Sequence, residues 1–218
     1  MIRRLAVLHT VRTLADRFHG ALREAHPGLD HFHMLDESLL QDLIRHGPST
    51  NVTRRAVSFA QQAADAGADL ILFTCSSTSP AVDVARATVA TPILKIDDPL
   101  MAAAVRAGRR IGLLCTASST AVPSEALMRA HAAELGIEPE IQVSLVAPAF
   151  EALSAGDRGR HDALLRQVAA TLAPGVDVIV LAQASMAHLQ EELGALTGRP
   201  VLASFPLAMA EIGRRMAA

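Results

Sequence analysis

The sequence predicts an α/β protein of two similar halves, each with a parallel sheet covered by helices on both faces. Short apolar runs rich in β-forming residues recur at nearly regular intervals, and longer amphipathic stretches separate most of them. An internal repeat then divides the chain into two parts of similar length. Short apolar strands that alternate with helices are typical of parallel sheets that are buried on both faces.

Eight segments are predicted as strands, because each is a short apolar run bounded by polar, Gly or Pro residues. In chain order they are Leu5–Leu8, Phe32–Leu35, Leu70–Phe73, Ile93–Ile96, Ile111–Leu114, Ile141–Val146, Val178–Leu181 and Val201–Leu202. Ser79 with Pro80, and Pro123 with the residues after it, are each predicted to open a helix, since proline is favoured in the first turn. Glycines 67, 108 and 136 are predicted to close three helices.

The repeat relates the ends of three strands in order. Residues 67–77 (GADLILFTCSS) resemble residues 175–185 (GVDVIVLAQAS), so that Gln183 lies 108 positions after Cys75. Residues 92–94 (PIL) correspond to residues 200–202 (PVL) at the same offset of 108. His9 and Cys115 lie at the ends of a third pair of corresponding segments, 106 positions apart. We therefore expect halves at about 1–97 and 98–205, related by pseudo-twofold symmetry, with the last helix (206–218) packing back onto the first half.

Ligands of open parallel sheets bind beyond the carboxyl ends of the strands. Two halves that face each other would enclose an active-site cleft there. His9, Cys75, Cys115 and Gln183 stand at predicted strand ends and are expected to line this cleft.

Composition excludes several classes of protein. Half of the 218 residues are hydrophobic and 19% are charged, as in a compact globular protein of one large or two small domains. A net charge of −2, with no Trp or Tyr, makes nucleic acid an unexpected partner. The N-terminal apolar run is short and lacks a cleavage site, so neither a signal peptide nor a membrane anchor is expected. The two cysteines match no disulfide or zinc spacing, which favours the cytoplasm.

Cys75 is the first candidate for chemistry. It ends a predicted strand and precedes four hydroxyl residues at the start of a predicted helix. Backbone N–H groups at such a position favour a thiolate and can bind an anion such as a substrate carboxylate.

The doubled α/β pattern and the two segments Asp69–Ser77 and Asp177–Met186 resemble the aspartate/glutamate/hydantoin racemase superfamily over nearly the whole chain. The resemblance implies a cofactor-independent enzyme in which two cysteines face each other across a small substrate. One thiol removes the α-proton and the other returns it on the opposite face. Cys75 matches the first of these cysteines, whereas Gln183 stands at the position of the second. An amide neither gives nor takes a proton near neutral pH, so the sequence favours chemistry with a single cysteine.

Polar residues around the predicted strand ends are candidates for binding a small carboxylate-containing substrate. They supply neutral donors of the kind that stabilise an oxyanion in a dry cleft. His9 is the candidate to hold a thiolate or relay a proton beside Cys75. The substrate-binding candidates are Thr10, Ser76, Ser77, Thr116, Ser118, Ser119, Thr120, Gln183, Ala184 and Ser185.

Other histidines and the second cysteine receive weaker predictions. His188 follows Gln183 by five residues and is a second candidate for proton transfer, while Cys115 is expected to pack in the core. His31 and His33 share one face of a strand, but the sequence offers no third ligand of suitable spacing. No metal site is therefore expected.

Three reactions remain open for a single-cysteine enzyme of this superfamily. Racemisation would need His9, His188 or a water opposite Cys75. Isomerisation of an unsaturated diacid, as in maleate isomerases, would use Cys75 as a nucleophile. Decarboxylation of a substituted malonate, as in arylmalonate decarboxylases, needs one proton donor. A non-catalytic protein that binds small carboxylates is the alternative of a different class. The sequence specifies neither the substrate nor its chirality, and it is compatible with assembly into a homo-oligomer.

Overall fold

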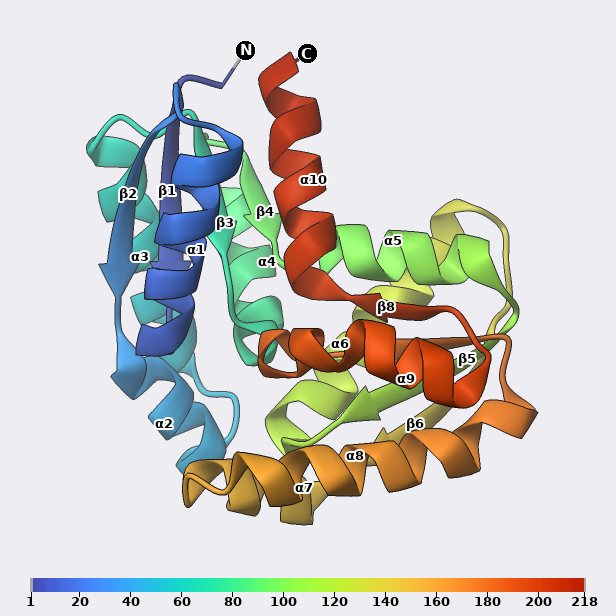
Figure 1. Cartoon of the computed structure of the whole chain (residues 1–218). Coiled ribbons are helices and arrows are strands. Elements are labelled where there is room, and N and C mark those ends of the chain that lie inside the picture. Colours follow the sequence, from blue (N-terminus) through green and yellow to red (C-terminus); the bar gives the residue numbers. More distant parts are fainter. Residues whose placement is uncertain (1, 218) are drawn as a thin grey trace. The chain divides into compact units, whose positions relative to one another are not determined.

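The computed structural model describes residues 2–217 and contains two four-stranded sheets whose strands are all parallel (Figure 1). The first sheet has the order β2-β1-β3-β4 and the second has the order β6-β5-β7-β8, so the two share one topology. This arrangement confirms the predicted α/β fold with two similar halves.

All eight predicted strands are present, with ends shifted by one or two residues in some cases. They are β1 (Arg4–His9), β2 (Asp30–Leu35), β3 (Leu70–Phe73), β4 (Ile93–Lys95), β5 (Arg110–Cys115), β6 (Glu140–Leu145), β7 (Val178–Leu181) and β8 (Val201–Ala203).

Helices connect the strands, as parallel pairing requires. They are α1 (Arg12–Ala25), α2 (Glu37–His46), α3 (Thr50–Asp65), α4 (Ser79–Thr88), α5 (Asp98–Ala107), α6 (Ser118–Glu134), α7 (Ala147–Ser154), α8 (Arg158–Leu172), α9 (Gln190–Thr197) and α10 (Ser204–Ala217). Three short 3₁₀ helices complete the described elements: η1 (Ser76–Thr78), η2 (Ala173–Gly175) and η3 (Ala184–Leu189).

The chain divides into two compact units. One holds the residues up to Ile96 together with those from Ala208 onward, and the other runs from Asp97 to Leu207. The helix that follows the last strand of one unit therefore belongs to the other. α5 follows β4 but lies in the unit from Asp97 to Leu207, and α10 follows β8 but lies mostly in the unit that ends its first stretch at Ile96.

Both faces of the first sheet are covered. Ala6, Leu8, Ile71 and Phe73 pack against the alanine-rich faces of α3 and α4, and these side chains are all buried. The alternate residues of β1 point to the opposite face, where α1 lies in front of the strands (Figure 1). There the ring of His9 meets that of Phe18 at a centroid distance of 5.9 Å.

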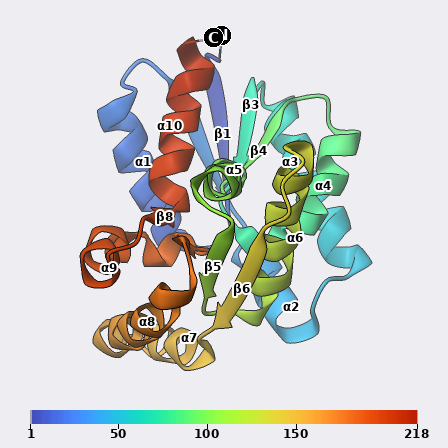
Figure 2. The same ribbon diagram turned by 90° about the vertical axis from the view of Figure 1, so that its right-hand side faces the viewer.

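The second sheet is covered in the same way. Leu114, Ile179 and Leu181 face α8 and α9, whereas Ile111, Leu113 and Cys115 face α5 and α6. A quarter turn of the molecule shows α6 and α8 on opposite sides of β5 (Figure 2). Each sheet thus has a core of its own.

The same contact of a carboxylate with a neighbouring strand is found in both units. Oδ2 of Asp69 accepts hydrogen bonds from the backbone N–H groups of Arg3 and Arg4, both at 2.9 Å. Oδ2 of Asp177 accepts from the N–H groups of Arg109 and Arg110 at 3.1 and 2.9 Å. In each unit, a carboxylate just before one central strand therefore fixes the start of its neighbour.

The prediction that Pro123 opens a helix is wrong. α6 begins at Ser118, and Pro123 lies inside it. Residues 118–120, which precede the predicted helix start at Pro123, therefore form the first turn of this helix. Ser79 does begin α4, with Pro80 in the first turn, but the 3₁₀ helix η1 precedes it.

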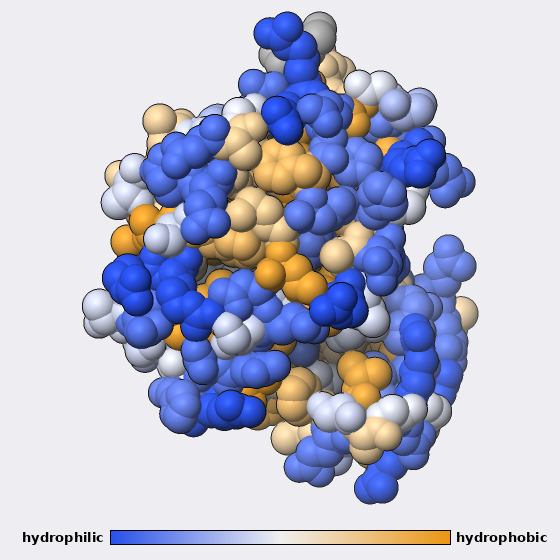
Figure 3. Space-filling view, turned by 90° about the vertical axis from the view of Figure 1, so that its left-hand side faces the viewer, coloured by the Kyte–Doolittle hydropathy of each residue, from blue (hydrophilic) through white to orange (hydrophobic). Residues whose placement is uncertain are grey.

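The outer edge of the first sheet is formed by β2, which pairs with β1 on one side. The face of the molecule on the β2 side of Figure 1 is mostly hydrophilic and carries patches of apolar side chains (Figure 3).

Among residues 2–217, no helix combines the length and the apolar character needed to cross a bilayer.

Candidate functional site

Two central strands of the first unit end in polar residues. His9 and Thr10 end β1, and Thr74 and Cys75 follow β3. The two strands are paired in register, with Leu8 opposite Phe73, so their carboxyl ends lie at the same edge of the sheet. Sequence reasoning placed these residues at strand ends, and the structure brings them to one edge.

His9 is fully buried and both of its ring nitrogens are engaged. Nδ1 lies 3.0 Å from Oγ1 of Thr74, and Nε2 lies 2.9 Å from Nδ1 of His33. Burial, and secondarily the nearby His33, lower the pKa of His9 from 6.5 to about 3. His9 is therefore a neutral imidazole near pH 7. Through Nδ1, His9 contacts Thr74, which is the residue before Cys75 in the sequence.

Cys75 is a free cysteine that is neither fully buried nor fully exposed. Its backbone is extended, with φ −124° and ψ 113°, and the chain then turns into η1 and α4. The carbonyl of Cys75 accepts from the N–H of Thr78 at 3.2 Å and from its hydroxyl at 2.7 Å. These bonds hold the strand-to-helix turn that presents the thiol. Ser76 and Ser77 lie within this turn and are buried, as is Thr10.

The corresponding turn of the second unit holds Gln183 instead of a cysteine. Oε1 of Gln183 accepts from the N–H of Thr116 at 2.5 Å, from its hydroxyl at 3.0 Å and from the N–H of Ala117 at 3.3 Å. Three donors at the end of β5 thus converge on one oxygen. Such a group of donors is suited to a carboxylate or an oxyanion, and here the amide oxygen of Gln183 takes that place.

Cys115, at the end of β5, is fully buried in the core between the sheet and α5 and α6. Its Sγ donates a weak hydrogen bond to the carbonyl of Ser144 at 3.8 Å. Burial raises the pKa of Cys115 to about 11, so the group is a thiol at neutral pH. These features fit the packing role that the sequence suggested.

The other predicted binding residues of the second unit lie at helix starts. Ser118, Ser119 and Thr120 form the first turn of α6, where Thr120 is buried and Ser118 is exposed. Ala184 and Ser185 begin η3, with Ala184 buried and Ser185 exposed.

His188 is held in a local network. Its Nδ1 lies 3.0 Å from the carbonyl oxygen of Ser185, and its Nε2 lies 3.0 Å from Oδ1 of Asp162. The same Oδ1 is 2.7 Å from Nδ1 of the buried His161. The two histidines lower the pKa of Asp162 by hydrogen bonds that outweigh its desolvation. Both ring nitrogens of His188 are thus engaged by partners in its own unit.

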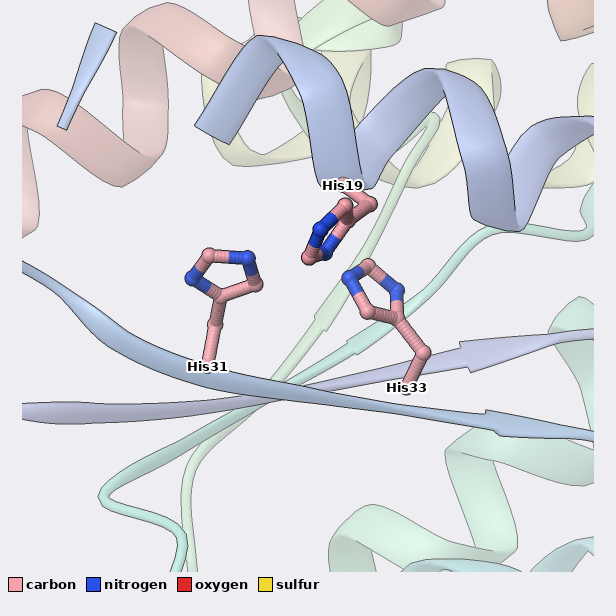
Figure 4. Close-up of side chains that lie close together, drawn as sticks. All are labelled: His19, His31 and His33. Atoms are coloured by element: carbon pink, nitrogen blue, oxygen red, sulfur yellow. The ribbon is translucent and has the colours of Figure 1, made fainter. Parts of the chain in front are cut away.

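His19 is a candidate functional residue that was not predicted from the sequence. On α1, His19 projects toward β2, and its ring meets those of His31 and His33 (Figure 4). Possible ligand atoms of the three side chains all lie within 4.8 Å of one another. The sequence feature that could have indicated His19 is the βαβ unit formed by β1, α1 and β2, because the helix of such a unit packs over the two strands that it joins. Which flank of α1 faces β2 could not be read from the sequence.

Comparisons with known proteins agree with the fold. The sequence profile of the Asp/Glu/hydantoin racemase family matches residues 2–212. No curated protein sequence is similar enough to count as a match.

Three solved structures illustrate the likeness. A protein from Yersinia pestis assigned as an Asp/Glu racemase has a TM-score of 0.76 and 18% identity, over 99% of this chain and 100% of that one. The aspartate racemase of Picrophilus torridus gives a TM-score of 0.69 and 12% identity, over 93% and 89%. The allantoin racemase of Klebsiella pneumoniae gives 0.69 and 17%, over 98% and 87%. At these identities the likeness concerns the fold.

Proposed function

Because this chain belongs to the Asp/Glu/hydantoin racemase family, we propose that it is a cofactor-independent isomerase acting on a small acid, with Cys75 as its reacting group. The reaction is proton transfer, or addition of a thiolate, at a carbon next to a carboxylate or a similar acyl group.

The observation that carries this proposal is the difference between the two cysteines. Cys75 is partly exposed at the end of a central strand, in a turn that leads into two helical segments. Cys115 is fully buried, and the pKa of its thiol is raised to about 11. A reacting cysteine must form a thiolate and reach its substrate, and the partial exposure of Cys75 supports the second condition.

In the proposed step, the Cys75 thiolate takes the proton from the α-carbon and becomes a thiol. The electron pair of the broken C–H bond moves into the adjacent acyl group and is stabilised as an oxyanion by neutral donors. Return of a proton to the α-carbon completes the exchange. Ser76 and Ser77 adjoin the thiol in sequence and are proposed as donors. Within the second unit, the donors of Thr116 that Oε1 of Gln183 occupies are proposed to bind a carboxylate.

Gln183 favours a second candidate within the same chemistry, decarboxylation of a substituted malonate. The carboxylate leaves as CO₂, its bonding electrons stay on the α-carbon, and the thiol proton of Cys75 is added there. This reaction needs one proton donor, and the second unit offers an amide at the position that corresponds to Cys75.

The test is a proton-NMR screen in D₂O with amino acids, hydantoins, maleate and substituted malonates. It detects α-proton exchange, isomerisation and loss of CO₂ in one format. We expect one substrate class to react with the unaltered protein and with Cys115→Ala, and not with Cys75→Ala. Alkylation should be fast at Cys75 and slowed by small dicarboxylates.

Turnover by Cys75→Ala, with loss of turnover in a folded Cys115→Ala variant, would contradict the assignment of the thiol. If nothing reacts in any class while dicarboxylates still protect Cys75, the chain is a non-catalytic carboxylate-binding protein. Melting curves of both variants provide the control for folding.

A further inference from the structure

Three histidines of the first unit converge between α1 and β2. His31 and His33 project from the same face of β2, and His19 reaches toward them from the helix (Figure 4). The ring centroids form a nearly regular triangle with sides of 5.3, 5.4 and 5.4 Å. We propose that His19, His31 and His33 form a binding site for a divalent transition-metal ion of the zinc class.

The tautomer of His33 is set by a chain of hydrogen bonds that ends on the backbone. The hydroxyl of Thr74 donates to the carbonyl of Leu8 at 3.1 Å, so its oxygen accepts the N–H of His9 Nδ1. Nε2 of His9 therefore lacks a proton and accepts the N–H of His33 Nδ1 at 2.9 Å. Each donor in the chain thus fixes the next, and the lone pair of His33 is left on Nε2.

The tautomer of His31 is set by a single hydrogen bond. Its Nδ1 lies 3.0 Å from the carbonyl oxygen of Leu29 and must donate its proton there. The lone pair of His31 is therefore also on Nε2. A metal-binding histidine is held in this way, with one nitrogen free for the ion and the other donating to a carbonyl or another acceptor.

These two lone pairs are buried and unused. Within the part of the chain from residue 2 to residue 217, Nε2 of His31 and Nε2 of His33 have no hydrogen-bond partner. Burying a polar atom without a partner is energetically unfavourable. A metal ion shared by the two nitrogens would remove that cost.

The donor set selects the class of ion. Imidazole nitrogens suit Zn²⁺, Ni²⁺, Co²⁺ and Cu²⁺, whereas Mg²⁺ and Ca²⁺ require oxygen ligands. In a tetrahedral zinc site with Zn–N bonds of about 2.0–2.1 Å, ligand nitrogens stand about 3.3 Å apart. The three ligand atoms lie within 4.8 Å. Small rotations about the side-chain bonds would close the remaining gap, and His19 is exposed and can move.

Three protein ligands leave one position of a tetrahedral ion open for water or an external ligand. Through His33, the proposed site is linked by hydrogen bonds to His9 and Thr74, next to Cys75. The proposal itself concerns binding of the ion and does not depend on the proposed reaction.

The experiment is a titration of the tag-free full chain with Zn²⁺ by calorimetry and with Co²⁺ by visible absorption. We expect one ion per chain and the intense bands of four-coordinate Co²⁺. His19→Ala and His31→Ala should each weaken binding by more than about tenfold. The matched control His46→Ala, which changes an exposed histidine at the end of α2, should bind like the unaltered protein.

His19 is exposed, so His19→Ala should melt like the unaltered protein in the presence of a chelator. Zn²⁺ should then raise the melting temperature of the unaltered chain and not that of His19→Ala. Cys75→Ser, which removes the sulfur of Cys75, should keep full affinity. Equal affinity in the unaltered protein and in His19→Ala, an equal loss in His46→Ala, or loss of binding in Cys75→Ser would each overturn the proposal.

Discussion

An amide and a thiol at the end of β7 differ in two ways that matter to the chemistry. The amide of Gln183 cannot exchange a proton near neutral pH, and its oxygen occupies the three donors supplied by Thr116 and Ala117. A cysteine at this position would be shorter and would leave those donors open. Under the proposed function, this one residue would therefore control both the number of acid–base groups and access to a carboxylate-binding position.

Two substitutions separate these effects. Gln183→Ala should open the donors without adding a thiol, and we expect tighter binding of small carboxylates with unchanged stereochemistry. Gln183→Cys should open the donors and add a second acid–base group, so the ratio of racemisation to α-proton exchange should rise. Both rates follow from NMR in D₂O combined with chiral chromatography.

In the unaltered protein, deuterium should be added to the α-carbon mainly from the face of the substrate that lies toward Cys75. The rate of α-proton exchange should therefore exceed the rate of racemisation. Equal rates of exchange and racemisation, lost on His188→Ala, would show instead that a histidine supplies the second base.

At the scale of the elements, the carboxylate of Asp177 links two neighbouring strands by hydrogen bonds. Asp177 precedes β7 and binds two backbone N–H groups at the start of β5 together with the side chain of Arg110, at 2.6 and 3.0 Å. The hydrogen bond from Arg110, then the backbone N–H groups, lower the pKa of Asp177 from 3.8 to about 2. Its folded pKa lies below the unfolded value, so its stabilisation is complete above about pH 4 and is lost as the pH falls toward 2.

We therefore expect Asp177→Asn to lower the urea midpoint at pH 7. The difference from the unaltered protein should shrink as the pH falls from 4 toward 2. Asp65→Asn is the control, because the carboxylate of Asp65 accepts from Gln61 on its own helix and links no strands. A difference between Asp177→Asn and the unaltered protein that stays constant down to pH 2 would show that charge is not the cause.

The elements show which parts of the fold the sequence could predict. Buried parallel strands are continuous apolar runs, so all eight were found from hydrophobicity alone. The start of α6 was misplaced, because proline at position 123 is typical of a first turn, whereas the end of β5 leads into the helix at Ser118. The convergence of His19 with His31 and His33 depends on how a helix is rotated against a sheet, and amphipathicity fixes that rotation too coarsely.

At the scale of the whole molecule, each unit has its own core and receives a helix from beyond the last strand of the other. Ile212 of α10 and Leu100 of α5 are both fully buried, the first in one unit and the second in the other. Replacing either by Ala should cost about 2–5 kcal/mol of unfolding free energy. We expect Ile212→Ala to speed hydrogen exchange mainly in β1–β4, and Leu100→Ala mainly in β5–β8. Equal acceleration in all eight strands for both variants would contradict two separate cores.

Most of the last helix, α10, belongs to the unit whose other residues are made first on the ribosome. The unit from Asp97 to Leu207 is one uninterrupted stretch of chain, whereas the other unit also needs the residues from Ala208 onward. During translation, the second unit can close as soon as Leu207 has left the ribosome. The unit whose synthesis begins first stays incomplete until the residues from Ala208 onward emerge. The N-terminal half is thus the part of the nascent chain that is longest exposed to chaperones and to aggregation.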